Sequence, residues 1–456
     1  MEKTIAAVAT GNAAGGLGVI RISGEKAIEI ANKVFKPQDG SSLSDLKGYR
    51  AKFGSIVFEG ETFDDAVALV FRAPKSYTGE DVVELSVHGG LFIIERTLEA
   101  VFAAGAVPAE AGEFTKRAFL NGKMDLTQAE SVADLISAQG ETAAKASYNA
   151  LQGALSNKIG DVLEALTDCS ASMAAWVDYP DEEIPELDDS VLVNTLESAC
   201  AALKELLATY ENGQAMIQGI DTAIVGRPNA GKSTLMNLLS GRDKSIVTTV
   251  EGTTRDVVED VVRLGELVLH LNDTAGLRES SDEVESIGIE RAYQKIESAM
   301  LILPVFDSSR PLNADDLDLI SKCENKKAVA IINKTDLPPA SEADISLITS
   351  AFDNCVFISA KNCRDTAELE RAIKKEIGAA NFDASAPLLA NQRQKLCCVK
   401  AFENISWALN CISSGITRDA VNVLIDDAIN ELLSLTGKKA TVEVVNNIFS
   451  KFCVGK

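Results

Sequence analysis

A phosphate-binding loop is the strongest chemical signal in the sequence. Residues 226–233 read GRPNAGKS and match the pattern G-x-x-x-x-G-K-S, between a strand-like run and a helical segment. The glycines let backbone N–H groups curl around phosphate oxygens, and the start of the helix adds partial positive charge. Lys232 brings a cation to the outer phosphates, and the Ser233 hydroxyl can bind Mg²⁺. These residues predict a nucleoside triphosphate site.

Three further motifs indicate that the base is guanine. DTAG at residues 273–276 can hold the magnesium shell through its aspartate and can offer a glycine N–H to the γ-phosphate. NKTD at 333–336 ends in Asp336, whose carboxylate can accept from two guanine N–H donors that adenine lacks. SAK at 359–361 would close over the edge of the base. Each motif is weak alone, but the four in this order predict GTP.

These motifs need a sheet whose strands end at a common edge. Each motif follows an apolar run typical of a strand, and helical segments separate the runs. Such alternation predicts an α/β module with a doubly wound, mostly parallel sheet. The five predicted strands are Thr222–Val225, Leu267–Leu271, Met300–Phe306, Val329–Ile332 and Val356–Ile358.

The chain on either side of this module has a different pattern. The N-terminal stretch is mixed α/β, with predicted strands at 5–10, 19–22, 66–71 and 82–87. From residue 126 apolar residues recur at helical spacing, as they do again after residue 378. We therefore predict a multidomain α/β plus all-α protein in which the α/β module interrupts a helical domain. The predicted domains are an N-terminal domain at 1–120, helical segments at 121–217 and 379–456, and the inserted module at 218–378.

Composition narrows the classes of protein that remain. The 456 residues include 44 basic and 67 acidic side chains, a net charge of −23, which argues against a broad nucleic-acid surface. The nine cysteines form no CxxC pair and there are two histidines, so a zinc site and a histidine-based triad have little support. No apolar run reaches the roughly 18 residues of a membrane span, and no signal pattern opens the chain. We expect a cytoplasmic protein without a membrane partner.

Further segments carry a family resemblance. The inserted module is similar to translation-factor-related GTPases, and Gly252–Asp256 resembles their first switch, with Thr254 as a magnesium ligand. Outside the module the matching segments are GEDVVE at 79–84, HGG at 88–90, GEFTKRAFLNGK at 112–123 and CVGK at 453–456. Together these segments resemble the MnmE (TrmE) family of tRNA-modifying GTPases, and the resemblance spans essentially the whole chain.

The resemblance implies a fold and an activity. The N-terminal α/β domain would bind tetrahydrofolate and form a homodimer, and the GTPase domain would split the helical domain. An FAD-dependent partner similar to MnmG would join it in a heterotetramer or larger assembly that modifies C5 of the tRNA wobble uridine (U34). A tetrahydrofolate one-carbon unit would yield the aminomethyl or carboxymethylaminomethyl form. Because the chain is acidic, we expect the partner to make most contacts with tRNA.

The resemblance also assigns a folate site. A 5-formyl- or 5,10-methylene-tetrahydrofolate would contact Arg21, Glu84, Lys123 and Lys456. A carboxylate suits the donors of the pterin edge, and basic side chains suit the glutamate end of a folate. Cys453 is invoked near the folate in the family, although a buried thiol is an equal interpretation.

Catalysis needs an unusual arrangement, because Leu277 directly follows DTAG and cannot orient water as glutamine would. By resemblance, Glu285 reaches the attacking water through a bridging water, Arg278 steadies the second switch, and Asn229 helps to hold K⁺ where an arginine finger would project. From its surroundings alone, Glu285 reads as a solvated surface residue.

The other K⁺ ligands would be Thr248, Val250 and Thr253, and Mg²⁺ would take Ser233 and Thr254. The predicted GTP contacts are Asn229, Ala230, Gly231, Lys232, Ser233, Thr234, Thr248, Thr249, Val250, Gly252, Thr253, Thr254, Asp273, Thr274, Ala275, Gly276, Asn333, Lys334, Asp336, Ser359, Ala360 and Lys361.

Some residues depart from the family pattern, and one alternative function is open. Ala111 stands where the family usually has proline, the turn at 11–16 lacks a proline, and Thr249 replaces a common aspartate. The alternative is a GTP-dependent switch in ribosome assembly. Such proteins usually add a basic RNA-binding tail, whereas residues 379–456 hold eight basic and seven acidic side chains. The charge balance therefore favours tRNA modification.

Overall fold

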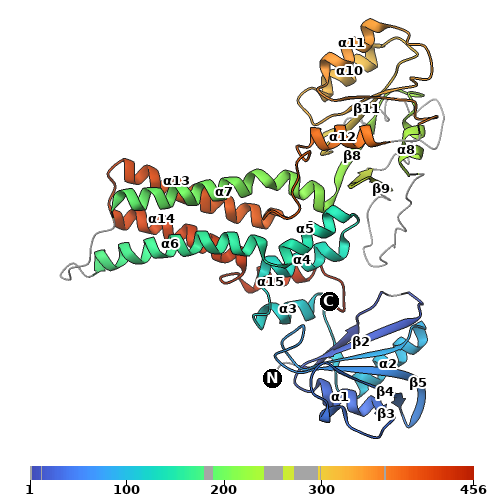
Figure 1. The fold of residues 1–456 in the computed structure, drawn as a ribbon, viewed down its shortest axis with the longest axis vertical. Helices are drawn as coiled ribbons and strands as arrows, with labels where there is room; N and C mark the ends of the chain where they lie inside the picture. Colours follow the sequence, from blue (N-terminus) through green and yellow to red (C-terminus); the bar gives the residue numbers. More distant parts are fainter. Residues whose placement is uncertain are drawn as a thin grey trace. The chain divides into compact units, whose positions relative to one another are not determined.

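The computed structural model forms two compact units. The described residues are 3–11, 13–178, 188–240, 260–271, 296–297, 299–363 and 366–456. The first unit comprises Met1–Ala133, Ser156–Ala199 and Lys400–Lys456, and the second comprises Asp134–Leu155 and Cys200–Val399. Figure 1 labels many of the elements of both units.

The first unit contains a seven-stranded sheet in the order β3-β4-β5-β6-β2-β1-β7. Neighbouring strands are antiparallel, except that β1 and β7 are parallel. The four strands predicted from the N-terminal sequence are confirmed as β1, β2, β5 and β6. The bounds are β1 Ile5–Val8, β2 Leu17–Ser23, β3 Phe35–Pro37, β4 Arg50–Phe58, β5 Glu61–Phe71, β6 Val82–His88 and β7 Val107–Pro108.

One face of this sheet forms a core beneath two helices, α1 (Ala27–Val34) and α2 (Leu91–Ala103), as Figure 1 shows. Side chains alternate along β2, so Ile20 and Ile22 are buried in this core and Arg21 lies on the other face. That other face, here called the open face, keeps exposed apolar side chains on β4 and β5. The sheet therefore offers one surface for packing and one for binding.

Helices complete the first unit and continue into the second. α3 (Glu113–Leu120), α4 (Leu126–Ser137) and α15 (Val442–Phe449) pack around the buried Leu126 and Phe449. Further helices outside the α/β module confirm the helical runs predicted on both sides of it. They are α5 Glu141–Leu151, α6 Ala154–Asp178, α7 Asp189–Gln218, α13 Gln392–Ser413 and α14 Arg418–Thr436. In the described ranges, no helix combines the length and the apolar composition that crossing a bilayer requires.

A six-stranded sheet forms the centre of the second unit, in the order β13-β12-β11-β8-β10-β9. All pairs are parallel except the β9–β10 hairpin. This arrangement confirms the predicted doubly wound, mostly parallel sheet. The bounds are β8 Ile220–Val225, β9 Asp260–Leu264, β10 Leu267–Leu271, β11 Leu301–Asp307, β12 Ala330–Asn333 and β13 Cys355–Ile358.

Both faces of this second sheet are buried. Along β12, Ile331 packs into one core and Ile332 into the other. Helices α8 (Lys232–Ser240) and α12 (Ala367–Glu376) contribute to the first core, and α10 (Ala314–Cys323) and α11 (Glu342–Ala351) to the second. Parallel strands all end at the same edge of the sheet, and the loops that follow them begin there. The motifs that follow β8, β12 and β13 therefore lie close together at this edge.

Candidate functional site

The phosphate-binding loop lies between β8 and α8, as the sequence predicts. Three of its residues have left-handed backbone, with φ of 148° at Gly226, 63° at Asn229 and 103° at Gly231. A Cβ at Gly226 would lie 2.5 Å from the carbonyl oxygen of Val305, so β11 leaves no room for a side chain there. Asparagine tolerates the left-handed conformation. The side chains of Asn229 and Ser233 are exposed, which leaves them accessible to ions.

Lys232 is held at this loop by backbone carbonyls. Its Nζ donates to the oxygens of Gly226 at 2.6 Å and Arg227 at 2.8 Å. Burial lowers the pKa of the ammonium group, because the charged form loses contact with water. A phosphate group beside Lys232 would offset this desolvation. The cation is therefore placed for an anionic ligand.

A buried asparagine connects three of the four predicted motifs. Asn333 Nδ2 donates to the carbonyl oxygen of Ala230 at 2.9 Å, and its Oδ1 accepts from the N–H of Ala360 at 3.0 Å. A Cβ at Gly231 would lie 2.0 Å from Asn333 Nδ2, so this contact also explains the glycine of the phosphate loop. The phosphate loop, NKTD and SAK are thus joined through one side chain that is 2% exposed.

The end of the site predicted to bind guanine is polar and open. Ser359 Oγ donates to Asp336 Oδ1 at 2.7 Å, which orients a carboxylate that remains exposed. Lys334, with φ of 64°, places its Nζ 2.7 Å from Asp307 Oδ2 at the end of β11. Burial raises the pKa of Asp307, but hydrogen bonds from Lys334 and Ser309 outweigh it and hold that pKa below its ordinary value. Asp307 stays ionised and anchors the NKTD segment.

An ion pair between the phosphate loop and α10 was not expected from the sequence. Arg227 Nη1 lies 3.0 Å from Asp316 Oδ2 and donates to the carbonyl oxygen of Pro311 at 3.2 Å. The side chain of Arg227 is 12% exposed and that of Asp316 is 1% exposed. Asn313 and Asp316 form a capping box at the start of α10, so N-x-x-D before a helix was the available signal. That signal locates the helix start but not the arginine.

Two further predicted GTP contacts, Thr234 on α8 and Lys361 after β13, are exposed. The other predicted GTP and catalytic residues fall outside the described residues, and their assignments stay predictions. They belong to the first switch, to DTAG and to the catalytic pair. They are Thr248, Thr249, Val250, Gly252, Thr253, Thr254, Asp273, Thr274, Ala275, Gly276, Arg278 and Glu285.

Two predicted folate residues pair on the open face of the first sheet. Arg21 on β2 and Glu84 on β6 are cross-strand partners, and Arg21 Nε lies 2.9 Å from Glu84 Oε1. The guanidinium carbon of Arg21 also lies 5.5 Å from the ring centre of Tyr77 and 5.6 Å from that of Phe114. These side chains form a half-buried site with a carboxylate, a cation and two aromatic rings.

The C-terminal tail closes one side of this site. Arg21 Nη1 donates to the carbonyl oxygen of Gly455 at 3.4 Å, and the N–H of Phe114 donates to that of Lys456 at 3.1 Å. Gly455 has φ of 97°, and a Cβ there would lie 2.1 Å from the carbonyl oxygen of Val8. The tail therefore places Gly455 against Arg21 and the backbone of Lys456 against Phe114, while the role predicted for the Lys456 side chain stays a prediction. Cys453 is exposed, so the interpretation of a buried thiol is wrong, because the tail lies along the surface at this residue.

Lys123, in the segment between α3 and α4, contacts the loop that contains Tyr77. Its Nζ donates to the carbonyl oxygen of Pro74 at 3.0 Å, and its side chain is otherwise exposed. Tyr77 was not predicted as a site residue. Its hydroxyl lies 2.8 Å from Thr115 Oγ1, and burial raises the pKa of its phenol. An aromatic residue next to the GEDVVE segment was the signal that could have found it.

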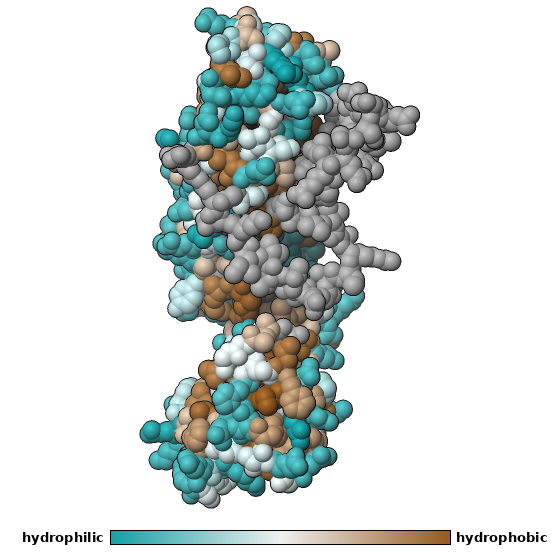
Figure 2. Space-filling model, turned by 90° about the vertical axis from the view of Figure 1, so that its right-hand side faces the viewer, coloured by the Kyte–Doolittle hydropathy of each residue, from teal (hydrophilic) through white to brown (hydrophobic). Residues whose placement is uncertain are grey.

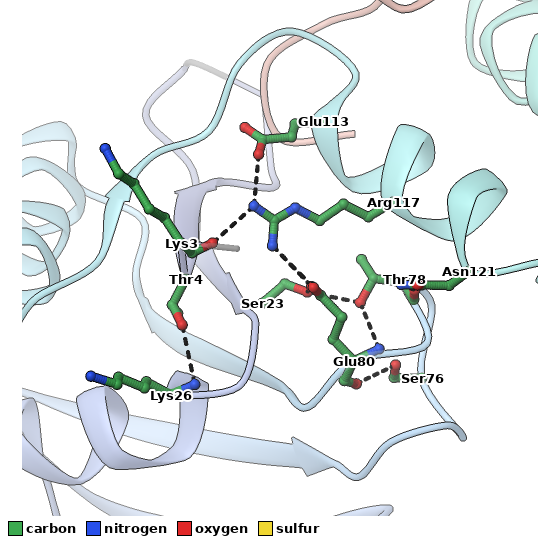
Figure 3. A network of polar contacts seen from close by, with 10 residues as sticks. All are labelled: Lys3, Thr4, Ser23, Lys26, Ser76, Thr78, Glu80, Glu113, Arg117 and Asn121. Atoms are coloured by element: carbon green, nitrogen blue, oxygen red, sulfur yellow. Dashed lines mark hydrogen bonds and ion pairs between the residues drawn. The ribbon is translucent and has the colours of Figure 1, made fainter. Parts of the chain in front are cut away.

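Arg117 holds this loop and α3 together, as Figure 3 shows. Its Nη1 lies 3.1 Å from Glu80 Oε1, and its Nη2 lies 2.7 Å from Glu113 Oε1. Ser23 Oγ donates to Glu80 Oε2 at 2.6 Å, which extends the network to β2. A buried guanidinium with two carboxylates is costly to disrupt, because removing one partner leaves an uncompensated charge. The network therefore fixes the loop that carries Tyr77.

Solved structures resemble part of the chain, with low superposition scores. Era from Aquifex aeolicus, solved with GDP and AlF4⁻, is 29% identical over 41% of this chain and 66% of its own, with a TM-score of 0.27. The G domain of the FeoB iron transporter from T. maritima is 24% identical over 34% of this chain and 98% of its own, with a TM-score of 0.25.

Sequence comparisons cover the whole chain. The family model for the MnmE helical domain matches residues 126–453, and the model for the N-terminus of GTP-binding protein TrmE matches residues 4–123. The tRNA modification GTPase MnmE of Acetivibrio thermocellus is 38% identical over 100% of this chain and 99% of its own length. The MnmE of Symbiobacterium thermophilum is 39% identical over 100% of both chains. This protein therefore belongs to the MnmE family of tRNA modification GTPases, enzymes that bind and hydrolyse GTP.

Proposed function

We propose that this protein is a potassium-activated GTPase that works with an FAD-dependent, MnmG-like partner on the wobble uridine of tRNA. A one-carbon unit from tetrahydrofolate would become part of the aminomethyl or carboxymethylaminomethyl group at C5 of U34. Family membership supports the tRNA substrate class, which also makes a cytoplasmic location the natural expectation. The observation that carries the folate part is the pairing of Arg21 with Glu84 under the C-terminal tail.

The second unit supports the proposed contacts with GTP. Lys232 and the loop N–H groups would bind the phosphates, and Asp336 would accept from the guanine N–H donors. Asn333 supports this assignment, because it connects the phosphate loop to both base-binding segments. Ser233 and Thr254 would hold Mg²⁺, which neutralises charge on the β- and γ-phosphates when bound.

The exposed Asn229 side chain supports a monovalent-ion site beside the phosphates. The other proposed ligands are Thr248, Val250 and Thr253. A bound K⁺ would supply the positive charge that an arginine finger supplies in other GTPases. Because Leu277 cannot orient water, we assign that role to Glu285, with Arg278 steadying the second switch.

The chemistry of the paired site supports a folate. A pterin presents N–H donors that a carboxylate such as Glu84 can accept, and the ring of Tyr77 offers an apolar face for a flat heterocycle. Lys456 and Lys123 supply cations for the carboxylates at the glutamate end. The Arg21 guanidinium, pinned by Glu84 and by the tail, would orient the ligand between these ends.

Exposed apolar side chains support a homodimer through the first sheet. Phe53 and Val67 are cross-strand partners on the open face, and they are 53% and 40% exposed. Figure 2 shows apolar side chains at the surface of the part of the chain that carries this sheet. Glu84 lies on the same face, opposite Leu69 on β5. A second copy on this face would bury the apolar pair and enclose the folate site.

Reconstitution of the modification tests the proposed function. The chain, an MnmG-like partner, tRNA, GTP, FAD, methylene-tetrahydrofolate and an ammonium or glycine donor are combined, and digested tRNA is analysed by mass spectrometry. We expect a modified U34 with the complete mixture, and none without folate or with Lys232→Ala. Product formed without folate would overturn the folate assignment, and product formed at full rate by Lys232→Ala would overturn the role of GTP.

A further inference from the structure

A groove in the first unit is not used by the proposed contacts except at one edge. It has a volume of about 690 Å³ and lies where the segment after α3 faces the segment between α14 and α15. Its apolar lining includes Phe119, Met124 and Val445, which pack against the cluster that joins α3, α4 and α15. Figure 1 shows these helices close together within the unit.

Three lysines make this groove basic in an acidic protein. Lys116, Lys123 and Lys438 line it, whereas the whole chain carries a net charge of −23. Lys116 Nζ donates to Asn446 Oδ1 at 2.8 Å, and Lys438 is exposed. Within the described part of the chain, none of the three lysines forms an ion pair. Their ammonium groups therefore retain donors for an external anion.

The single carboxylate among the lining residues does not neutralise these lysines. Asp125 Oδ1 accepts from the N–H of Gln128 at 2.9 Å and from Thr127 Oγ1 at 2.7 Å. These hydrogen bonds cap the first turn of α4, where a carboxylate also interacts favourably with the helix dipole. The carboxylate is thus directed to the helix and not to the lysines of the groove.

The groove shares one residue with the proposed folate site. Lys123 borders both, because it lines the groove and contacts the carbonyl of Pro74, three residues before Tyr77. The ring of Tyr77 in turn lies under the Arg21 guanidinium. A ligand whose pterin end met Arg21 and Glu84 would thus have its anionic end directed along this loop to Lys123.

We propose that the groove binds the γ-linked glutamate tail of a polyglutamylated folate. Each added glutamate brings one carboxylate, which can pair with a lysine, and a methylene stem, which can pack on the apolar lining. The tail therefore matches the groove in both charge and polarity. The proposal rests on the folate part of the proposed function. It makes Lys116 and Lys438 tail-binding residues that leave the pterin end untouched.

Calorimetry with folates of different tail length tests this proposal. The full-length protein is titrated with 5-formyl-tetrahydrofolate carrying one, three or five glutamates. We expect affinity to rise about threefold to fivefold for each added glutamate up to the third, the range of an exposed ion pair. Lys438→Ala and Lys438→Gln should reduce this gain and leave monoglutamate binding unchanged. Lys439→Ala is the matched control, because Lys439 donates to Asn430 and does not line the groove.

The outcomes separate failure of the proposal from failure of the folate assignment. Equal affinity for all tail lengths would overturn the groove proposal while leaving the folate site intact. Absence of binding to every folate would overturn both. A third arm titrates tRNA into the same variants: if Lys438→Gln weakens tRNA binding and leaves the tail-length gain unchanged, the groove is a nucleic-acid surface and the proposal is wrong.

Discussion

Single side chains connect motifs that are far apart in the sequence. Asn333 belongs to NKTD, but both hydrogen bonds of its side chain go to backbone groups of other segments, Ala230 and Ala360. Its buried position makes these bonds valuable, because losing one partner leaves a desolvated polar group at a cost of about 1–3 kcal/mol. Asp336, three residues later, is exposed instead, which suits a group reserved for a ligand.

Base selection is predicted to depend on the Asp336 carboxylate. In Asp336→Asn, one of the two acceptor oxygens becomes an amide N–H donor that would face a guanine N–H donor. Two donors that face each other cannot form a hydrogen bond, so the substitution should weaken GTP binding by about 10²–10³-fold. The amide N–H can donate to the C2 carbonyl of xanthine, so the variant should bind xanthosine triphosphate better than GTP. Fluorescent-nucleotide titration measures both affinities. Ser359→Ala serves as a control, since it removes one hydrogen bond to the carboxylate without changing its charge. Unchanged preference in Asp336→Asn would contradict the assignment.

Potassium dependence is predicted from Asn229, whose exposed side chain lies in the phosphate loop with φ of 63°. GTP hydrolysis should be at least about tenfold faster in K⁺ than in Na⁺ at equal ionic strength, because an added cation stabilises the charge that develops on the phosphates. Phosphate release measured in the two salts tests this expectation. Equal rates would contradict the K⁺ site.

Glu285→Ala should abolish turnover in K⁺ and retain GTP binding, and a loss of binding would indicate a structural role.

At the scale of elements, the C-terminal tail is a structural part of the proposed folate site. Gly455→Ala should displace the tail, because the new Cβ would lie 2.1 Å from the Val8 carbonyl oxygen. Folate affinity measured by calorimetry should fall at least about tenfold, while GTP hydrolysis by the protein alone should be unchanged. Gly60→Ala is the matched control: its φ is 87°, close to the 97° of Gly455, but nothing lies within 4 Å of its Cβ. Equal effects of the two substitutions would show that backbone strain, not the tail contact, is responsible.

The α10 helix is predicted to be fixed to the phosphate loop by the buried pair of Arg227 and Asp316. Asp316→Ala leaves a guanidinium that is 12% exposed without its partner, so it should lower the free energy of unfolding by about 3–5 kcal/mol. The double variant with Arg227→Met should recover part of this loss. Urea unfolding measures each. Asp318→Ala on the same helix is the control: its pair with Lys322 is solvent-exposed and should cost less than about 1 kcal/mol. Similar losses in both single variants would contradict the buried-pair interpretation.

Local patterns predicted the elements that bury a regular set of side chains. β8, β10, β11, β12 and β13 follow apolar runs, and the sequence places each within a few residues of its bounds. β4 (Arg50–Phe58) was not predicted, because only Gly54 and Ile56 are buried in it and its first half is mostly exposed. Its place in the sheet depends on pairing with β5 across a hairpin, which overrides its weak local pattern.

Contacts between distant segments could not be predicted in the same way. The pairing of Arg21 with Glu84 joins residues 63 apart, and the contact of Arg21 with Gly455 joins residues 434 apart. Motif resemblance located these residues but contained no distances. The roles of Tyr77 and Arg227 were missed, because a ring against a guanidinium and a buried ion pair have no spacing rule along the chain.

At the scale of the whole molecule, the net charge of −23 limits how the protein can handle tRNA. Affinity for nucleic acid comes largely from lysines and arginines that replace counterions at phosphates. Here acidic residues outnumber basic ones by 67 to 44, and basic groups such as Arg117 and Arg227 are engaged in buried pairs. The groove with Lys116, Lys123 and Lys438 is small and suits a short anion better than a duplex.

The partner is therefore predicted to make most of the tRNA contacts. The chain alone should bind tRNA with a dissociation constant in the non-specific range of about 10⁻⁴–10⁻⁶ M, and the MnmG-like partner should bind at least about tenfold more tightly. Filter binding at a series of salt concentrations measures both the affinity and the number of phosphates contacted, since the slope of log K against log salt grows with each neutralised phosphate. The slope for the complex should match that of the partner alone. A complex with a markedly steeper slope than its partner would contradict this division, because the additional phosphate contacts would then come from the acidic chain.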